Sequence, residues 1–339
     1  MPNYYTHCPE TFLASSNNAS KATELAERLE YLKTTDLLLR ENNLMSDTFI
    51  HRELNKGTGW IADPIDERDK QLSMDVPAKL PTSIDLREWC SPIKDQGKIN
   101  SCTAHAAIAL MEYYQRRSFG KTFDASRLFL YKVTRNLINN QQDNGANARS
   151  TMKALALFGV PPEEYWPYDA TKIYEEPTAF CYALASNYQA LKYYRLDVKG
   201  TTREVVLQQI KANLANNRPL MFGSILDLEC LEQSKSTGKM PVPSKSPDAK
   251  GINIQWIGHT MAAVGYDDSI TIKNAEPAST ETVGAILVRN SWGSEWGEGG
   301  YGWLPYNYVL QPLTNDWWTM LTQEWLDTGK FETKSSGND

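Results

Sequence analysis

The chain reads Asp95-Gln96-Gly97-Lys98-Ile99-Asn100-Ser101-Cys102-Thr103-Ala104 at the start of a segment with helical periodicity. Apolar residues recur there at the spacing of one helix face, at Ala104, Ala107, Ile108 and Met111. This pattern predicts a helix over residues 101 to about 116, with Cys102 in its first turn. Unpaired backbone N–H groups and the helix dipole at that position favour a thiolate. The alternative is a buried structural cysteine, a common fate of free cysteine.

A base for this thiol must come from only four histidines. His7 and His51 lie in the N-terminal region. His105 lies on the same predicted helix as Cys102 and cannot face the thiol from across a cleft, so we expect it to pack or to be partly exposed. His259 directly precedes a predicted strand over residues 261–266, and a strand is a rigid mount for a catalytic group. We therefore expect His259 to be the general base.

Two side-chain amides and a tryptophan complete this pattern. Asn290 ends a predicted strand over residues 284–290, and its carbonyl oxygen is expected to accept a hydrogen bond from His259 and orient the ring. Trp292 is expected to shield that bond from water. Gln96 is expected to donate its NH2 group to an oxyanion, with the backbone N–H of Cys102 as second donor. Singly, these residues are equally compatible with a turn residue, a core aromatic and an exposed glutamine. Together they predict acyl transfer through a thiol.

Composition excludes several other classes of protein. The chain has 339 residues, 41% of them hydrophobic and 22% charged, as in an ordinary soluble globular protein. Its formal net charge of −6 argues against nucleic acid and against an anionic membrane as partners. The N-terminus has neither a basic nor an apolar signal region, and no stretch reaches the length of a membrane span. The five scattered cysteines fit neither a disulfide framework nor a zinc site, so no metal or cofactor is expected.

The order of the expected elements indicates an α+β fold. Helical patterns at residues 126–136, 150–158 and 202–216 follow the Cys102 helix, and short apolar strands are expected at 219–224, 261–266 and 284–290. The first half would carry Cys102 and the second His259 and Asn290, so the site is expected in a cleft between two lobes. Residues 233–255 have little periodicity and are expected to form a long surface loop.

The N-terminal region differs from the rest of the chain. An amphipathic helix is expected from Ser20, followed by an irregular tether over residues 57–69 that Trp60 and Ile61 pin in place. Asp63, Asp66 and Asp69 could bind calcium, but without EF-hand spacing a solvated acidic loop is the favoured interpretation.

Considered together, the segments around these residues resemble the papain-like cysteine peptidases. Besides Gln96-Gly97 and Ser101-Cys102, the family order is kept in four further segments. These are Asp85-Leu86-Arg87, Asp143-Asn144-Gly145, Gly258-His259 and Asn290-Ser291-Trp292-Gly293-Ser294-Glu295-Trp296-Gly297. The resemblance covers residues 81 to about 310. It implies a two-lobed fold with a helical left lobe and an antiparallel, β-barrel-like right lobe.

The resemblance also implies peptide hydrolysis through a thioacyl intermediate. In this interpretation Cys102 attacks, His259 moves the proton, Asn290 orients the imidazole and Gln96 stabilises the oxyanion. Its implied partners are a peptide or protein substrate and the chain's own N-terminal segment as an intramolecular inhibitor. The expected organisation is an N-terminal extension over 1–80 that could act as a prosegment, a peptidase domain over 81–325 and a flexible polar tail over 326–339. Substrate-binding residues would be Asn144, Gly145, Ala146, Gly258, Thr260 and Trp292, with Thr260 and residues 315–318 suggested for a side-chain pocket.

Departures from the family pattern refine this interpretation. Ile99 stands where many members carry a half-cystine, and with the absent signal region this predicts a reducing, cytoplasmic setting. Thr103 stands where the family usually has tryptophan. In this respect the chain resembles the bacterial and archaeal branches of the family. The loop over 233–255 could cover one end of the cleft and restrict the enzyme to chain ends, so endopeptidase and exopeptidase activity both remain open. A non-catalytic peptide-binding homologue and a transamidase or amidase with the same triad are the alternatives.

Overall fold

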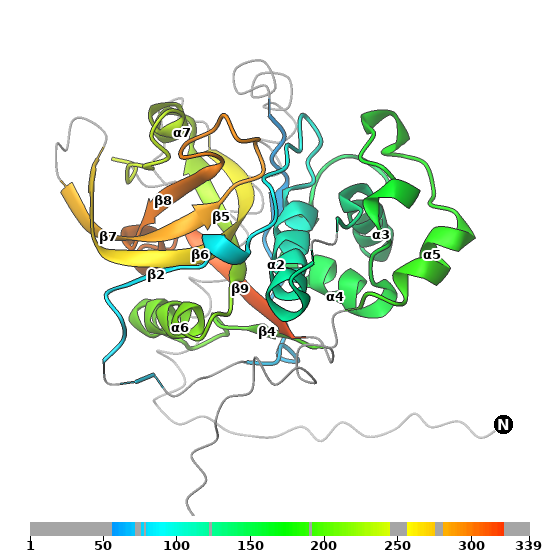
Figure 1. Cartoon of the computed structure of the whole chain (residues 1–339). Coiled ribbons are helices and arrows are strands. Elements are labelled where there is room, and N and C mark those ends of the chain that lie inside the picture. Colours follow the sequence, from blue (N-terminus) through cyan, green and yellow to red (C-terminus); the bar gives the residue numbers. More distant parts are fainter. Residues whose placement is uncertain are drawn as a thin grey trace, which may run out of the picture.

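The structure is a computed structural model that describes residues 56–71, 76–77, 79–121, 124–189, 192–244, 256–274 and 281–321. It has two lobes that lie side by side, one helical and one built on an antiparallel sheet (Figure 1). The helical lobe contains α2 (Cys102–Phe119), α3 (Arg127–Leu137), α4 (Ala148–Phe158), α5 (Ala179–Ala185) and the 3-10 helices η2 (Glu163–Tyr165) and η3 (Ala170–Lys172). The helix expected from Ser20 and the tail expected over 326–339 lie outside the described residues.

The β lobe is a sheet of seven strands in the order β4-β9-β5-β6-β7-β8, with β2 paired to β6. In the described residues β4 and β8 end this path without pairing with each other, so the sheet is open rather than a closed barrel. The strands are β2 (Ser83–Asp85), β4 (Lys192–Arg195), β5 (Leu220–Asp227), β6 (Trp256–Lys273), β7 (Glu281–Arg289), β8 (Tyr301–Pro305) and β9 (Thr314–Leu321). The helices η1 (Arg87–Trp89), α6 (Arg203–Ala215), α7 (Leu228–Ser234) and α8 (Asn307–Leu310) complete the described elements beside this sheet.

Side-chain caps explain where the helices begin. Ser126 accepts a hydrogen bond from the Phe129 N–H at the start of α3, and Asn147 and Thr202 accept equivalent bonds at the starts of α4 and α6. Each cap satisfies an N–H group that has no partner within its own helix. Gly159 ends α4 with a φ of 72°, a conformation that glycine adopts without strain. The four longer helices predicted from periodicity are therefore confirmed, with boundaries that shift by up to three residues.

Strand β6 differs from its prediction in a way that matters for the site. It begins at Trp256, five residues before the predicted start, so His259 lies inside the strand rather than before it. Residues 256–260 pair with β5, and Ser224 is the register partner of His259. The residues before and after His259 along β6 also pair with β5, so the histidine lies on a rigid part of the sheet.

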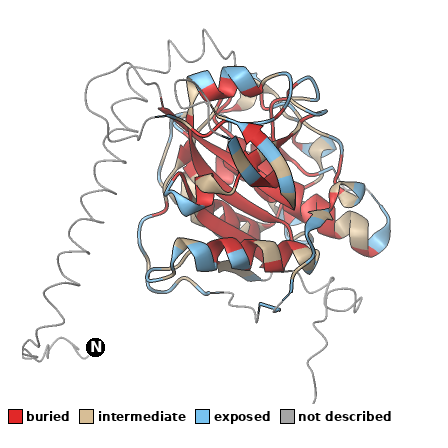
Figure 2. Cartoon of the chain, turned by 90° about the vertical axis from the view of Figure 1, so that its left-hand side faces the viewer, coloured by how far each residue is buried: buried red, intermediate tan, exposed pale blue. Residues whose placement is uncertain are grey.

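Helix α2 forms the boundary between the two lobes (Figure 1). It packs against β5 and β6 on one side and against α3 and α4 on the other. Its residues from Cys102 to Tyr114 are all buried, since both faces are covered. The strands behind it are largely buried, whereas α6 exposes its outer face (Figure 2). None of the described helices combines the length and the apolar character needed to cross a bilayer.

Short elements were missed from the sequence because they have too few turns to show a period. Helices α5 and α7 have seven residues each and begin at caps formed by Thr178 and Asp227.

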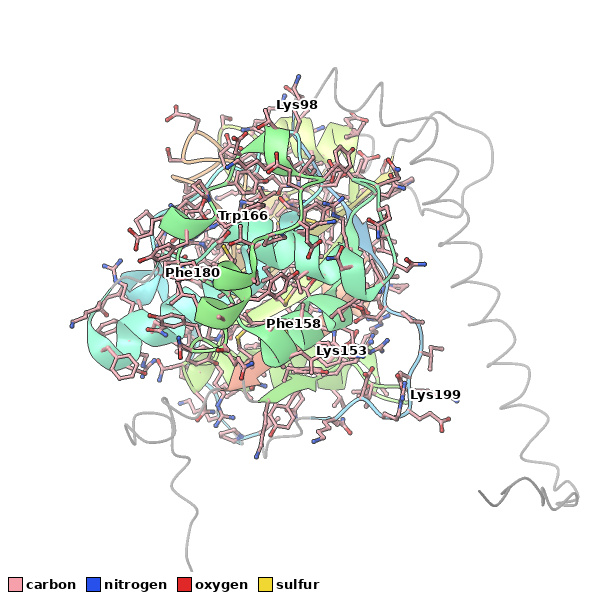
Figure 3. All side chains as sticks on the ribbon, turned by 90° about the vertical axis from the view of Figure 1, so that its right-hand side faces the viewer. Lys98, Lys153, Phe158, Trp166, Phe180 and Lys199 are labelled. Atoms are coloured by element: carbon pink, nitrogen blue, oxygen red, sulfur yellow. The ribbon has the colours of Figure 1, made fainter. Side chains whose placement is uncertain are left out.

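Figure 3 shows the outer side of the helical lobe, where Phe158 lies at the end of α4 and Phe180 on α5. Phe180 is 60% exposed, so α5 covers the lobe with only part of its apolar surface.

Candidate active site

Cys102 is the first residue of α2, as predicted, and it is fully buried. Burial raises the pKa of its thiol to about 12, against the opposing effect of hydrogen bonds from Thr260 and from the N–H groups of Cys102 and Thr103. The contact with Thr260 places the sulfur beside the residue that follows His259. In this conformation the thiol is protonated at neutral pH, because burial outweighs the helix N-terminus.

His259 and Asn290 lie in contact on neighbouring strands. His259 Nε2 and Asn290 Oδ1 are 2.8 Å apart, and Nδ1 of the ring has no hydrogen-bond partner among the described residues. The Trp292 ring stacks on the imidazole, with centroids 4.4 Å apart and planes at 24°. Burial lowers the pKa of His259 to about 4, although the hydrogen bond to Asn290 opposes this shift. The structure thus brings His259 together with the two residues expected to orient and shield it, Asn290 and Trp292.

Gln96 is fully buried and points its amide into the same region. Its Oε1 accepts a hydrogen bond of 2.5 Å from the Ser291 hydroxyl, and its Nε2 lies 2.8 Å from the Ile99 carbonyl oxygen and 3.4 Å from that of Thr58. Ser291 also donates its backbone N–H to Asn290 Oδ1 at 2.7 Å. The residue after Asn290 therefore orients the amide of Gln96. Reasoning from the sequence did not identify this role of Ser291.

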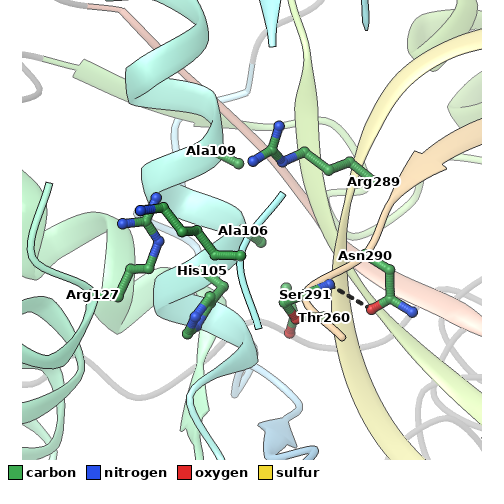
Figure 4. Close-up of a pocket in the computed structure, with 9 residues that line it drawn as sticks. His105, Ala106, Ala109, Arg127, Thr260, Arg289, Asn290 and Ser291 are labelled. Atoms are coloured by element: carbon green, nitrogen blue, oxygen red, sulfur yellow. Dashed lines mark hydrogen bonds between the residues drawn. The ribbon is translucent and has the colours of Figure 1, made fainter. Parts of the chain in front are cut away.

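His105 has the packing role expected of it. Its Nδ1 lies 3.1 Å from the Ser101 carbonyl oxygen, and its ring meets Tyr168 edge to face at 5.1 Å. Burial lowers its pKa to about 3. A small pocket of about 10 Å³ includes His105, Thr260 and Asn290 in its lining. Figure 4 shows His105 and Arg127 on the helical side of this pocket and Arg289 and Asn290 on the strand side.

Two buried, neutral histidines predict that stability falls as the medium becomes acidic. The unfolded chain gains protons at His105 and His259 below their ordinary pKa of 6.5, whereas the folded chain resists this down to about 3 and 4. The free energy of unfolding should therefore decrease between pH 6.5 and 4, by up to about 1.4 kcal/mol per pH unit for each histidine. Urea unfolding followed by tryptophan fluorescence at several pH values measures this slope.

The His105→Asn variant isolates one of these contributions. Asparagine keeps a donor for the Ser101 carbonyl group but does not titrate. As the pH falls below 6.5, the free energy of unfolding should decrease more steeply for the parent than for the variant, because the variant lacks one of the two histidines. Parallel curves for the two proteins would show that His105 does not resist protonation in the fold.

A segment of the N-terminal region runs between the two lobes, as the blue ribbon beside α2 in Figure 1. On the helical side, Gly57 donates its N–H to the Gly97 carbonyl at 2.6 Å, and Gly59 accepts from Ala146 N at 2.9 Å. On the β side, Gly59 donates to the Gly258 carbonyl at 3.1 Å, and the Gly57 carbonyl accepts from Trp292 Nε1 at 3.1 Å. Residues 57–59 thus bond to both walls at once.

This segment continues as β1 (Trp60–Ile61), which pairs in parallel with β3 (Ala146–Asn147). Four residues expected to bind substrate, Gly145, Ala146, Gly258 and Trp292, line it. Thr260 instead lies at the Cys102 thiol, and Asn144 is exposed beside Gly145. A Cβ on Gly145 would overlap the Gly59 backbone, so glycine is required there while the segment is in place.

Arginines fasten the segment beyond the cleft. Asp63 is buried and Asp69 is partly buried, and each pairs with Arg195 at 3.5 Å. Asp69 Oδ1 also accepts from Arg149 Nε at 2.7 Å. The interpretation of Asp63, Asp66 and Asp69 as a solvated loop was therefore wrong for Asp63, and Asp66 pairs with Arg68. Among the described residues, no group of three or more His, Cys, Asp or Glu side chains is arranged to hold a metal ion. The sequence could not show this cluster, because its arginines follow the aspartates by 80 to 132 residues.

Residues 233–255 are only partly a surface loop. Helix α7 ends at Ser234, and Met240 beyond it is buried and donates its N–H to the Trp303 carbonyl of β8 at 3.0 Å. Residues 245–255 lie outside the described part of the chain. The described half is therefore anchored to the sheet, because its apolar residues Met240 and Val242 pack into the core.

Comparison with known proteins agrees with this fold. A model of the papain family of cysteine proteases matches residues 80–311. A peptidase C1-like protein of Acanthamoeba polyphaga mimivirus is 34% identical over 290 residues, which cover 78% of this chain and 86% of the relative. Xylellain, a cysteine protease from Xylella fastidiosa, is 31% identical with a TM-score of 0.66, over 79% of this chain and 97% of that chain. The digestive procathepsin L 3 of Tenebrio molitor, 19% identical with a TM-score of 0.57 over 82% and 80%, shares the fold.

A two-lobed α+β fold with a cysteine at the start of the central helix defines a thiol peptidase. The chain belongs to the papain family of cysteine proteases and is a cysteine-type peptidase.

Proposed function

We propose that Cys102, His259, Asn290 and Gln96 carry out peptide hydrolysis in this chain. The observation that carries the proposal is the His259–Asn290 pair under Trp292, one residue from the Thr260 backbone that contacts the Cys102 thiol. The imidazole is held through Nε2, so Nδ1 is the nitrogen left to exchange a proton with the thiol. Asn290 thereby orients the ring without itself taking a proton.

The reaction follows from these positions. His259 Nδ1 takes the proton of the Cys102 thiol, and the sulfur attacks the carbonyl carbon of the scissile bond. Gln96 Nε2 and the Cys102 N–H stabilise the oxyanion, and His259 returns the proton to the leaving amine as the C–N bond breaks. Water activated by the same imidazole then hydrolyses the thioester, which frees the carboxylic acid and the thiol.

We also propose that the segment over residues 56–71 holds the enzyme latent. Its glycines bond to both walls of the cleft, and the Thr58 carbonyl lies at the amide of Gln96, where an oxyanion would sit. With the segment in place, Cys102 and His259 are both fully buried. Burial keeps both groups neutral, so the thiolate–imidazolium pair that reacts fastest is disfavoured. Part of the 1–80 extension thus acts as the intramolecular inhibitor.

A reducing, cytoplasmic setting is part of this proposal. Ile99 is 5% exposed where many relatives carry a half-cystine, so packing replaces a disulfide at this position. Cys102 and the three other described cysteines are free thiols, and a reducing compartment keeps a nucleophilic thiol in that state.

Thiol labelling combined with peptide turnover tests the proposed chemistry. An epoxysuccinyl inhibitor should modify Cys102 alone, identified by peptide mass mapping, and internally quenched peptides should be cleaved at an amide bond. Labelling without turnover of any peptide would favour the transamidase or amidase. Neither labelling nor turnover, in the intact chain and in a chain with the segment loosened, would favour the non-catalytic homologue.

The same incubation shows whether the segment must be cut away. We expect the purified chain to be labelled slowly at first and faster as residues before 80 are removed, as followed by intact mass. An unchanged mass together with full activity from the first minutes would contradict latency.

A further inference from the structure

We infer that the pocket that holds the Trp60 side chain is a substrate subsite selective for aromatic side chains with an N–H or O–H donor, and that Gly223 and Asp316 determine this selectivity. The inference rests on the proposed latency, because the pocket becomes free only when the segment leaves the cleft. Trp60 is 2% exposed, one residue after Gly59, which bonds to both walls. The indole thus enters the β lobe from the line that a substrate backbone would follow.

Glycines shape this pocket around a two-ring side chain. A Cβ on Gly223 of β5 would overlap the indole, and the three atoms nearest to it all belong to Trp60. A Cβ on Gly258 of β6 would lie 2.6 Å from the Trp60 carbonyl oxygen and 3.3 Å from the indole. Neither glycine has a positive φ, so the backbone would accept a larger residue at both positions. At both positions the nearest atoms belong to Trp60, which indicates that the glycines leave room for a large ring and for its backbone.

Asp316 supplies a hydrogen-bond acceptor in the pocket. Its Oδ2 accepts from Trp60 Nε1 at 3.0 Å and from the Asp63 N–H at 2.8 Å, while its Oδ1 accepts from Arg195 at 2.7 Å. Asp316 has a φ of 58° and is held there by Asp197, which accepts from its N–H at 2.8 Å. When the segment leaves, Oδ2 loses both donors while the carboxylate stays at the wall. A buried acceptor without a donor is costly, so a substrate that supplies one is favoured.

Charge decides between a neutral donor and a cationic one. With the segment in place, the cluster has four carboxylates, from Asp63, Asp69, Asp197 and Asp316, against the guanidinium groups of Arg149 and Arg195. Without the segment, Asp197 and Asp316 remain paired with Arg195, and Arg149 loses its partner Asp69. Arg203 also lines the adjoining cavity. The vacated pocket therefore has no excess of negative charge to attract lysine or arginine. A neutral ring with a polar hydrogen, as in tryptophan or tyrosine, fits best.

The test uses the full chain with Trp60→Ala as a common background, in which the pocket is vacated. Internally quenched peptide libraries scan each position around the scissile bond, and rates are normalised to the thiol titrated by an epoxysuccinyl inhibitor. We expect one position to prefer tryptophan and tyrosine over valine by at least about 10-fold in kcat/KM. Adding Gly223→Val should reduce this ratio at least about 10-fold, because the valine side chain would occupy the space of the indole.

Asp316→Asn tests the acceptor separately, because asparagine tolerates a positive φ and keeps the shape of the side chain. The matched substrates contain tryptophan or benzothienylalanine, which has sulfur in place of the indole N–H. The background chain should prefer tryptophan by about 10-fold, as expected for a hydrogen bond to a charged acceptor, and Asp316→Asn should bring the ratio to within about threefold.

The outcomes distinguish a failure of the proposed subsite from a failure of the proposed function. A background chain that is labelled and cleaves peptides, but prefers no large aromatic residue at any position, overturns the subsite alone. An unchanged tryptophan preference in Asp316→Asn overturns the role of Asp316. A background chain that is neither labelled nor active overturns the proposed function and the subsite with it.

Discussion

Replacing Cys102 by alanine is expected to abolish peptide hydrolysis, lowering kcat/KM by at least about 10⁴-fold. Without the sulfur no thioester forms, and the remaining groups have no nucleophile to activate. The measurement compares rates on an internally quenched peptide, with Trp60→Ala in both chains so that the cleft is open. Near-ultraviolet circular dichroism should be unchanged, because the substitution removes one buried atom at a helix start.

Cys230→Ala is the matched control for this loss. Cys230 lies on α7 in the β lobe, is buried like Cys102 and has no place in the proposed reaction. Its rate should stay within about threefold of the parent. Residual turnover of Cys102→Ala above about 1% of the parent, after removal of contaminating peptidases, would assign the chemistry to another group.

Replacing Trp60 by alanine is expected to open the cleft and raise the labelling rate of Cys102 by about 100-fold. Removing a buried tryptophan costs about 3–5 kcal/mol, and each 1.4 kcal/mol shifts an equilibrium tenfold. A 100-fold change corresponds to about 2.8 kcal/mol in the docking of the segment, close to the lower end of that range. The rate constant of inactivation by an epoxysuccinyl inhibitor, at a concentration far below saturation, measures the change. Activity on peptides should rise in parallel.

Ile65→Ala provides the control in the same segment. Ile65 is 48% exposed and lies beyond the Trp60 pocket, so its removal should change the labelling rate less than about threefold. Equal rates for the parent, Trp60→Ala and Ile65→Ala, all fast, would show that the segment does not restrict the thiol. Equal slow rates would show that Trp60 is not what holds the segment in the cleft.

Several features of the site could be predicted because their signals are local or compositional. The start of α2 follows from apolar spacing after Ser101, and with four histidines in the chain the choice of His259 required little beyond its position before a strand. The pairing of His259 with Asn290 was expected from residue type, and the strands β6 and β7 bring the two side chains to 2.8 Å. The Ser291–Gln96 bond was not expected, since serine after Asn290 has no periodicity or motif that separates it from a turn residue.

The sequence by itself determined the proposed nucleophile, the proposed base and their order along the chain, since residue chemistry and the local start of a helix decide these. Only the tertiary structure decided which residues occupy the Trp60 pocket and how deeply Cys102 is buried. Trp60 is in contact with Gly223 and bonded to Asp316, more than 150 and 250 residues away, and no pattern within one segment encodes such a contact. Burial in the folded chain also reverses the effect of the helix N-terminus, raising the pKa of Cys102 to about 12. Desolvation depends on every atom packed around a group, and only the folded chain brings those atoms together.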